Sequence, residues 1–169
     1  MFKNILTIKN KKEEEFLRKP AKPVKNPAAP EIKALIKTMR EIMISGKGVG
    51  LSANQLGEDK KIFVAEFEGN FYALINPEII KYSKEIETAE EGCLSVPGIV
   101  GLVPRAQKIT VRAFNDRGKT LKIKAKDMLA RIFQHETDHL DGNLFIDKAK
   151  EIFEASPAER LIKRETELK

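Results

Sequence analysis

The sequence contains only two histidines, and both lie in one short stretch from Gln134 to Gly142. His135 and His139 are four residues apart, so on a helix their side chains point the same way, one turn above the other. Two imidazoles in this arrangement can hold one divalent metal, and Glu136 beside them can take a proton from a water at that metal. The same spacing also occurs on exposed polar faces of helices, so the rest of the helix must decide between the two interpretations.

The residues around these histidines predict a helix over 128–140, with Asp127 as its N-terminal cap. At about 100° per residue, its large apolar residues fall on one face. They are Leu129, Ile132, Phe133 and Leu140. Glu136 falls on the same face and both histidines lie at its edge, so the proposed metal would sit where the helix meets the core. An exposed polar face would place the histidines on the opposite side.

The first thirty residues predict a strap on the surface. Residues 1–10 alternate weakly and suggest a short strand or turn, and residues 10–30 contain four prolines, which argues for an extended chain without a helix. Pro30 then marks the start of a helix that ends near Gly46. Its apolar residues recur at helical spacing: Ile32, Leu35, Ile36, Met39, Ile42 and Met43.

Two hairpins are expected in the middle of the chain. Residues 62–67 and 71–75 predict the first, with Asn76-Pro77 ending its second strand, and residues 108–114 and 119–125 predict the second.

Antiparallel strands with two main helices indicate an α+β fold, in which the strands pack around a central metal-binding helix. We expect a single domain over residues 1–169, with residues 150–169 forming a charged C-terminal helix.

The composition excludes several classes of protein. With 169 residues, 41% of them hydrophobic, the chain is long enough to bury a core, which argues against disorder. The apolar runs are too short to cross a bilayer and the N-terminus lacks a signal sequence, so we expect a cytoplasmic protein without a membrane partner. The net charge of +6 is spread along the chain, which predicts no specific nucleic-acid partner but is compatible with contact with the ribosome.

A catalytic metal needs a third protein ligand and an open position. Cys93 is the strongest candidate, because it is the only cysteine and lies in a tight Gly-Cys segment after residues 85–90, a polar strand or loop. A lone cysteine is more often a small buried hydrophobic residue. A downstream carboxylate is the alternative, and Glu154, Glu159 and Glu165 lie at suitable separations. The spacing alone leaves both choices open.

Three segments of the chain stand out: Gly-Val-Gly-Leu-Ser-Ala-Asn-Gln at 48–55, Glu-Gly-Cys-Leu-Ser at 91–95 and Gln-His-Glu-Thr-Asp-His at 134–139. Together they resemble the bacterial-type peptide deformylase family. The likeness covers about residues 5–148. It departs from the family pattern at Ser52, where alanine is usual, and a buried hydroxyl there must find a partner. It also departs at Gly98 and Val100, where many relatives have polar or basic residues along the cleft.

The resemblance implies a metal-dependent hydrolase that removes the formyl group from the N-terminal formyl-methionine of newly made polypeptides and releases formate. It implies Cys93, His135 and His139 as ligands of one divalent metal per chain, with Fe²⁺ as the physiological ion and Zn²⁺, Ni²⁺ or Co²⁺ able to substitute. The substrates, and hence the partners, are N-formylmethionyl peptides and nascent chains.

The resemblance also implies catalytic roles for three residues. Glu136 would accept a proton from the reacting water and pass it to the departing amine. The side-chain amide of Gln55 and the backbone N–H of Leu94 would stabilise negative charge on the formyl oxygen, at about 3 kcal/mol per well-placed donor.

The peptide is expected to add as an extra strand beside the loop around Gly50 and the strand before Gly92. The residues expected to line a pocket for the methionine side chain are Val49, Met128, Ile132 and Leu94. For each of these four, ordinary core packing is an equally good interpretation.

Glu91, Arg105 and Asp138 are expected to support the metal ligands from behind. A carboxylate commonly holds the second nitrogen of a ligating histidine, and a buried arginine can brace such a group. Helical phase turns Asp138 away from the metal, so we expect it to pair with Arg105.

Two other functions are considered. A zinc peptidase would use a downstream glutamate as its third ligand. A metal-stabilised module that binds RNA or the ribosome would normally need four protein ligands and would have no use for Glu136.

Overall fold

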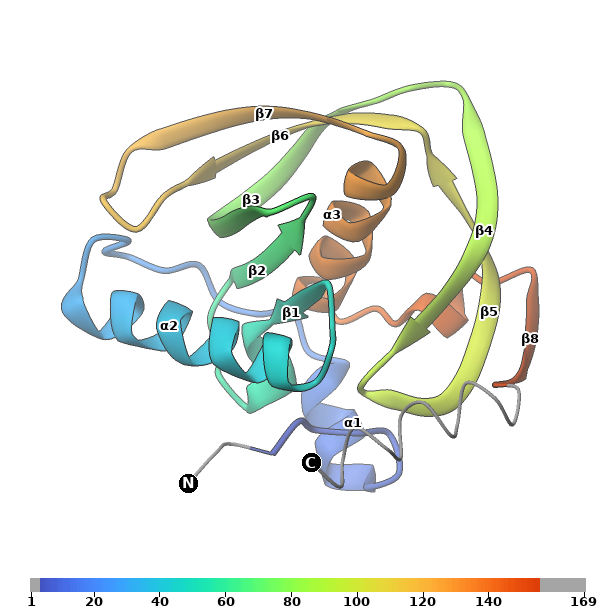
Figure 1. Ribbon diagram of the computed structural model, residues 1–169. Coiled ribbons are helices and arrows are strands. Elements are labelled where there is room, and N and C mark those ends of the chain that lie inside the picture. The colour runs from blue at the N-terminus through green and yellow to red at the C-terminus, as the bar shows by residue number, and fades with distance from the viewer. Residues whose placement is uncertain (1–3, 156–169) are drawn as a thin grey trace.

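The computed structural model describes residues 4–155 as two antiparallel sheets arranged around one central helix (Figure 1). The helices are α1 (Lys11–Leu17), α2 (Pro30–Ser45) and α3 (Asp127–Leu140), with short 3-10 turns at η1 (Ala53–Leu56) and η2 (Phe145–Asp147). The strands are β1 (Gly50–Ser52), β2 (Ile62–Phe67), β3 (Asn70–Tyr82), β4 (Ile86–Cys93), β5 (Val96–Ala106), β6 (Lys108–Phe114), β7 (Thr120–Lys126) and β8 (Glu151–Glu154). This arrangement confirms the predicted α+β fold.

Within the described residues, one sheet has five strands in the order β1-β2-β3-β6-β7 and the other has three in the order β4-β5-β8. The two predicted hairpins are present as β2–β3 and β6–β7. Figure 1 shows α3 in the centre, with β4 and β5 curving past one side and the larger sheet on the other. A residue at the end of β4 and residues on α3 can therefore meet.

The larger sheet lies between α2 and α3. Successive residues of β2 point to opposite faces, as strand geometry requires. Phe63 and Ala65 pack with α3, where the rings of Phe63 and Phe133 are 5.4 Å apart. Ile62 and Val64 pack with the apolar stripe of α2. This double burial fixes the position of α3 against the sheet. Within residues 4–155, every helix is too short or too polar to span a lipid bilayer.

The N-terminal strap contains a helix, so the prediction of an extended chain over 10–30 was wrong for α1. The prolines begin only at Pro20, and nothing in residues 11–17 prevents helix formation. The side chain of Asn10 caps α1 by accepting hydrogen bonds from the N–H groups of Lys12 (3.0 Å) and Glu13 (3.3 Å). Residues 18–29, which hold the prolines before α2, form neither helix nor strand.

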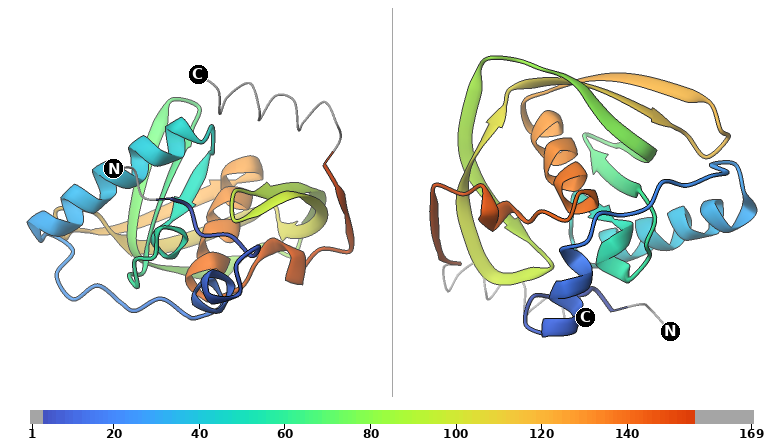
Figure 2. Two further views of the ribbon diagram at one scale, coloured as in Figure 1. Left: turned by 90° about the horizontal axis from the view of Figure 1, so that it is seen from below. Right: turned by 180° about the vertical axis from the view of Figure 1, so that it is seen from behind.

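The strap crosses the C-terminal end of α3 (Figure 2). The N–H of Ala21 donates to the carbonyl of Leu140 (2.8 Å), and Arg18 forms an ion pair with Asp147. Gly142 ends this crossing with φ +80°, and a Cβ there would lie 2.4 Å from the carbonyl oxygen of Arg18. Glycine is therefore required at this position by both conformation and space.

Asp127 does not cap α3, contrary to the prediction. Lys126 is the N-cap, without a side-chain hydrogen bond, and Asp127 is the first helical residue, with φ +52°. Its N–H donates to the carbonyl of Gln107 (2.8 Å), which holds the sharp turn from β7 into the helix.

Two strand boundaries also differ from expectation. Asn76-Pro77 does not end the second strand of the first hairpin, because β3 continues to Tyr82 through an irregularity between Ile75 and Glu78. Asn76 has φ +51° there, and its side chain bonds both the N–H and the carbonyl of Val24. The strand thus bends while the strap is fastened to it.

The C-terminal helix predicted for 150–169 was wrong for Glu151–Glu154, which pair with β5 as β8. The part of that prediction beyond residue 155 lies outside the described residues. Strand β5 was not expected, because Pro97 and Pro104 interrupt its pattern. The polar segment 85–90 does form most of a strand, β4.

Candidate active site

Cys93, His135 and His139 converge from two elements. Cys93 ends β4, and the two histidines lie one turn apart on α3. Their sulfur and ring nitrogen atoms all lie within 4.8 Å of one another. The Nε2 atom of His139 is 3.2 Å from the sulfur of Cys93 and 3.2 Å from Nε2 of His135. The structure therefore brings together the three residues that the sequence nominates as ligands.

These distances fit a shared metal ion. With metal–nitrogen bonds of about 2.0–2.1 Å and a metal–sulfur bond of about 2.3 Å, two donors on one tetrahedral ion lie roughly 3.3–3.6 Å apart. The alternative ligand Glu154 lies exposed on β8, outside this donor group, and Glu159 and Glu165 lie outside the described residues. The group can thus hold a single metal.

The charge distribution among the donors supports the same conclusion. Burial raises the pKa of the Cys93 thiol, but the positive charge of His139 and hydrogen bonds to both histidines outweigh burial and hold the pKa well below its ordinary value. Burial lowers the pKa of His135, but hydrogen bonds to Cys93 and Glu91 raise it well above its ordinary value. The sulfur therefore carries negative charge, which positive charge beside it must balance. A divalent ion supplies that positive charge when its ligands are a thiolate and neutral imidazoles.

Glu136 is buried beside the donors, between α3 and β1. The hydroxyl of Ser52 lies 2.7 Å from its Oε2. Burial raises the pKa of Glu136, and the positive charges of His135 and His139 offset only part of that effect. A carboxylate with a raised pKa is a better proton acceptor near neutral pH than an ordinary glutamate.

Gln55 and Leu94 flank the thiolate. Gln55 is buried in η1, and its Nε2 lies 3.0 Å from the hydroxyl of Ser95 and 3.5 Å from the sulfur of Cys93. Its Oε1 accepts the N–H of Ser52 (2.9 Å), which fixes the orientation of the amide. Leu94 follows Cys93 in the turn between β4 and β5.

A buried charge network supports His135, as the sequence predicted for Glu91, Arg105 and Asp138. The Nδ1 atom of His135 lies 2.8 Å from Glu91, whose carboxylate also accepts two hydrogen bonds from Arg105 (2.9 and 3.0 Å). Arg105 also pairs with Asp138, which faces away from the donors. Burial raises the pKa of Glu91, but hydrogen bonds with His135 and Arg105 outweigh burial and place it well below its ordinary value.

Arg131 is a member of this network that the sequence analysis missed. It donates to Glu91 (2.8 Å) and to the carbonyls of Val103 (2.9 Å) and Glu87 (2.8 Å). Its position four residues before His135 puts it on the same side of α3 as the histidines, and this spacing was the available signal. Arg131 thus ties α3 to both β4 and β5.

The residues expected to bind substrate lie in different surroundings. Val49 and Met128 are large apolar residues exposed at the surface, whereas Ile132, on α3, is buried in the core. Gly50 begins β1, and Gly92 precedes Cys93 in β4. In the described part of the chain, β1 and β4 are both edge strands.

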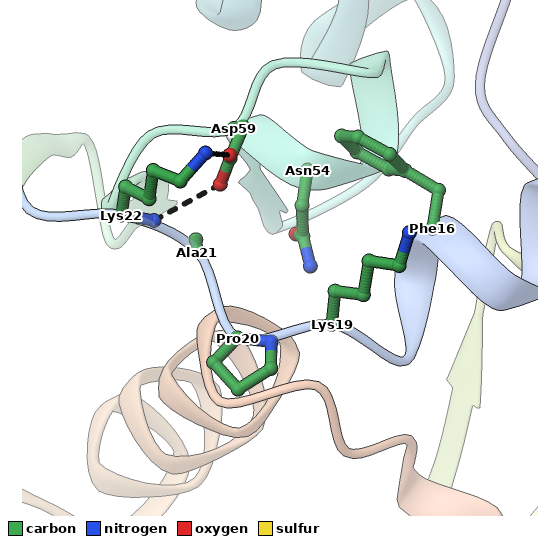
Figure 3. A pocket seen from close by; sticks show the side chains of 7 residues that line it. All are labelled: Phe16, Lys19, Pro20, Ala21, Lys22, Asn54 and Asp59. Atoms are coloured by element: carbon green, nitrogen blue, oxygen red, sulfur yellow. Dashed lines mark hydrogen bonds and ion pairs between the residues drawn. The ribbon is translucent and has the colours of Figure 1, made fainter.

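A hollow of about 270 Å³ lies beside this region, between the strap and η1 (Figure 3). It is lined by Phe16, Lys19, Pro20, Ala21, Lys22, Asn54 and Asp59. Asn54 donates to the carbonyl of His139 (2.6 Å), so it links η1 to α3. None of the metal donors lines this hollow. The hollow is therefore separate from the group of candidate metal ligands.

Comparison with known proteins gives consistent matches. Residues 2–154 match the family model described as Polypeptide deformylase. A peptide deformylase from Syntrophomonas wolfei is 45% identical over 147 residues, covering 87% of this chain and 93% of the relative.

Solved structures agree with these sequence matches. The crystal structure of peptide deformylase from Thermotoga maritima is 38% identical and aligns with a TM-score of 0.83, covering 89% of this chain and 99% of that one. A Met-Ala-Ser-bound class I type b peptide deformylase from Acinetobacter baumannii is 30% identical with a TM-score of 0.80, covering 85% and 96%.

Proposed function

The chain belongs to the polypeptide deformylase family and is a hydrolase that removes the formyl group from the N-terminus of new polypeptides; we propose that Cys93, His135 and His139 hold its metal and that Glu136 is its general base. One observation carries this proposal. A thiolate and two imidazoles converge within 4.8 Å beside a buried carboxylate.

When bound, a divalent ion polarises the formyl group and makes a water acidic enough to react near neutral pH. We infer one ion per chain. A thiolate with two imidazoles suits both ferrous iron and zinc, and the family resemblance favours Fe²⁺ as the physiological metal. Zn²⁺, Ni²⁺ and Co²⁺ are the expected substitutes.

Glu136 moves the proton that the reaction requires. Water adds across the formyl amide: a new oxygen–carbon bond forms, the carbon–nitrogen bond breaks, and a proton travels from the water to the amine. The raised pKa of Glu136 suits it to accept this proton and then release it to the leaving nitrogen. The products are formate and a free N-terminus.

Gln55 and Leu94 are proposed to stabilise the negative charge that develops on the formyl oxygen. The Gln55 amide is held by Ser52 and Ser95, so its N–H groups lie beside the sulfur of Cys93 before substrate arrives. Donors fixed in advance need no reorganisation during the reaction, and loss of one such donor costs roughly 10²–10³ in kcat.

The two edge strands beside the donors support a binding mode for the peptide. We infer that it adds as a strand between β1, at Gly50, and β4, at Gly92. Val49 and Met128 offer exposed apolar surface for the methionine side chain, while Ile132 would support the pocket from the core. The relative from Acinetobacter binds Met-Ala-Ser, which supports formyl-methionyl peptides as substrates here. We infer that the enzyme works in the cytoplasm, where nascent chains leave the ribosome.

Formate release from formyl-Met-Ala-Ser by the Fe²⁺-loaded protein tests the function. We expect Glu136→Gln to keep its metal and lose about 10²–10⁴-fold in kcat. We expect Cys93→Ala to lose stoichiometric metal. A Cys93→Ala variant that kept both metal and activity would refute the ligand set. Release of methionine from unformylated Met-Ala-Ser would instead support a peptidase.

A further inference from the structure

Strand β1 presents two residues to Glu136. Residues two apart in a strand point to the same side. A Cβ added at Gly50 would lie 2.5 Å from Oε1 of Glu136, and the Ser52 hydroxyl lies 2.7 Å from Oε2. Leu51 points the other way, into the core beneath α2. The glycine and the serine therefore meet the two oxygens of one carboxylate.

The two oxygens are held differently. Oε2 accepts the Ser52 hydroxyl, which is fully buried. Among the described residues, no hydrogen bond to Oε1 is found. A hydroxyl has one hydrogen, so it donates to one acceptor at a time. The carbonyl oxygen of Glu136 is also within reach of the hydroxyl, at 3.0 Å, but Oε2 is closer, at 2.7 Å.

We propose that Ser52 is a positioning residue for the general base: its hydroxyl holds Oε2 of Glu136 and leaves Oε1 as the oxygen that exchanges the proton. The hydroxyl hydrogen bond uses one lone pair of Oε2 and makes this oxygen the weaker acceptor, so Oε1 is favoured to take the proton from water. The close approach of Gly50 limits rotation of the carboxylate on the other side. This inference rests on the proposed role of Glu136.

Ser52 also reaches the proposed oxyanion donor. Its backbone N–H donates to Oε1 of Gln55 (2.9 Å), while its side chain holds Glu136. One residue thus fixes the base and the amide relative to each other. Alanine at this position keeps the backbone contact and removes only the hydroxyl contact. Deformylases with the more usual alanine lack that second contact, so its effect in this chain must be incremental rather than essential.

Steady-state kinetics of Ser52→Ala on formyl-Met-Ala-Ser test the proposal. We expect kcat to fall about five- to tenfold, the size of one typical intramolecular hydrogen bond expressed as a rate, with KM within about twofold. Metal content should stay stoichiometric. An unchanged kcat would overturn the proposal, and so would a fall caused by lost metal.

Two further variants separate positioning from packing. Ser52→Cys keeps most of the volume but donates weakly, so its kcat should also fall; wild-type kcat in this variant would show that Ser52 only fills space. Thr137→Val is the matched control, because Thr137 is a buried neighbour of Glu136 on α3 whose hydroxyl has no partner in the described structure. Its kcat should stay at the wild-type value.

A stability cycle gives a readout that does not depend on turnover. Thermal unfolding of Ser52→Ala, Glu136→Ala and the double variant measures the coupling between the two side chains. Ser52→Ala should lower Tm less when Glu136 is already alanine. Equal losses in both backgrounds would refute the contact. Full activity in Glu136→Gln would refute the base assignment itself and leave this coupling a separate result.

Discussion

Replacing Glu91 with glutamine should destabilise the protein by about 3–5 kcal/mol, the usual cost of breaking a buried ion pair from one side. The carboxylate accepts two hydrogen bonds from Arg105, one from Arg131 and one from His135, at 2.8–3.0 Å. Glutamine keeps the shape but turns an N–H₂ group toward donors on one side. Arg105 would keep Asp138 as a partner, whereas Arg131 would keep only two carbonyls.

Urea unfolding of the metal-loaded and chelated proteins measures this loss in two parts. The chelated proteins report the ion-pair network alone, and in thermal unfolding the same loss should appear as a fall in Tm of about 10 °C for a chain of this size. In the metal-loaded Glu91→Gln variant, the side chain of His135 is also held less firmly, so metal affinity should fall by about 10–100-fold.

Glu90→Gln provides the matched control, because Glu90 is the exposed neighbour of Glu91 on the same strand. Its stability should change by less than about 0.5 kcal/mol. A loss below about 1 kcal/mol in Glu91→Gln would refute the view that this network holds the fold together around the metal.

Three more results are expected. Gly50→Ala should reduce kcat by about 100-fold with the metal retained, because its Cβ would displace Oε1 of Glu136; unchanged kinetics would show that the carboxylate is not confined there. Gly142→Ala should lower the free energy of unfolding by about 2–4 kcal/mol in urea, through its positive φ and the collision with Arg18, and leave kcat intact below the melting temperature. The pKa of Glu91 is depressed in the folded protein, so the Glu91 carboxylate stabilises the fold fully above its ordinary pKa of 4.5, and this stabilisation is lost as the pH falls below 4.5. Tm measured against pH should show this loss in the wild type and much less of it in Glu91→Gln.

Helix α3 could be predicted from sequence because the residue patterns that indicate it are local. Two histidines at positions i and i+4, with apolar residues at helical spacing, define both the helix and the edge of its buried face. Residues 30–45 were predictable for the same reason, since their apolar stripe repeats with the period of a helix. Cys93 was different: it was the strongest candidate from the residues, but a downstream carboxylate stayed possible until the family resemblance decided for the thiolate.

The missed features depend on context that local patterns do not carry. Residues 10–30 contain four prolines, and this composition led us to miss the proline-free helix α1, which Asn10 caps. Pro97 and Pro104 argued against a strand at β5, but pairing with β4 on one side and β8 on the other stabilises it.

The hydrogen-bond partners of buried polar side chains could not be predicted from the sequence either. Ser52 finds its acceptor 84 residues away and Arg131 finds Glu91 40 residues away. Such contacts become visible only when the fold brings distant segments together.

The crossing of the strap over α3 determines the order in which contacts can form while the protein is synthesised. Arg18 and Ala21 leave the ribosome early, but their partners Leu140, Gly142 and Asp147 are synthesised more than a hundred residues later. Contacts between such distant segments form late and slow the folding of a chain. The helix that carries both histidines follows strands β1 to β7 in the sequence. A growing copy of this enzyme therefore cannot bring its three proposed metal ligands together until translation has passed His139.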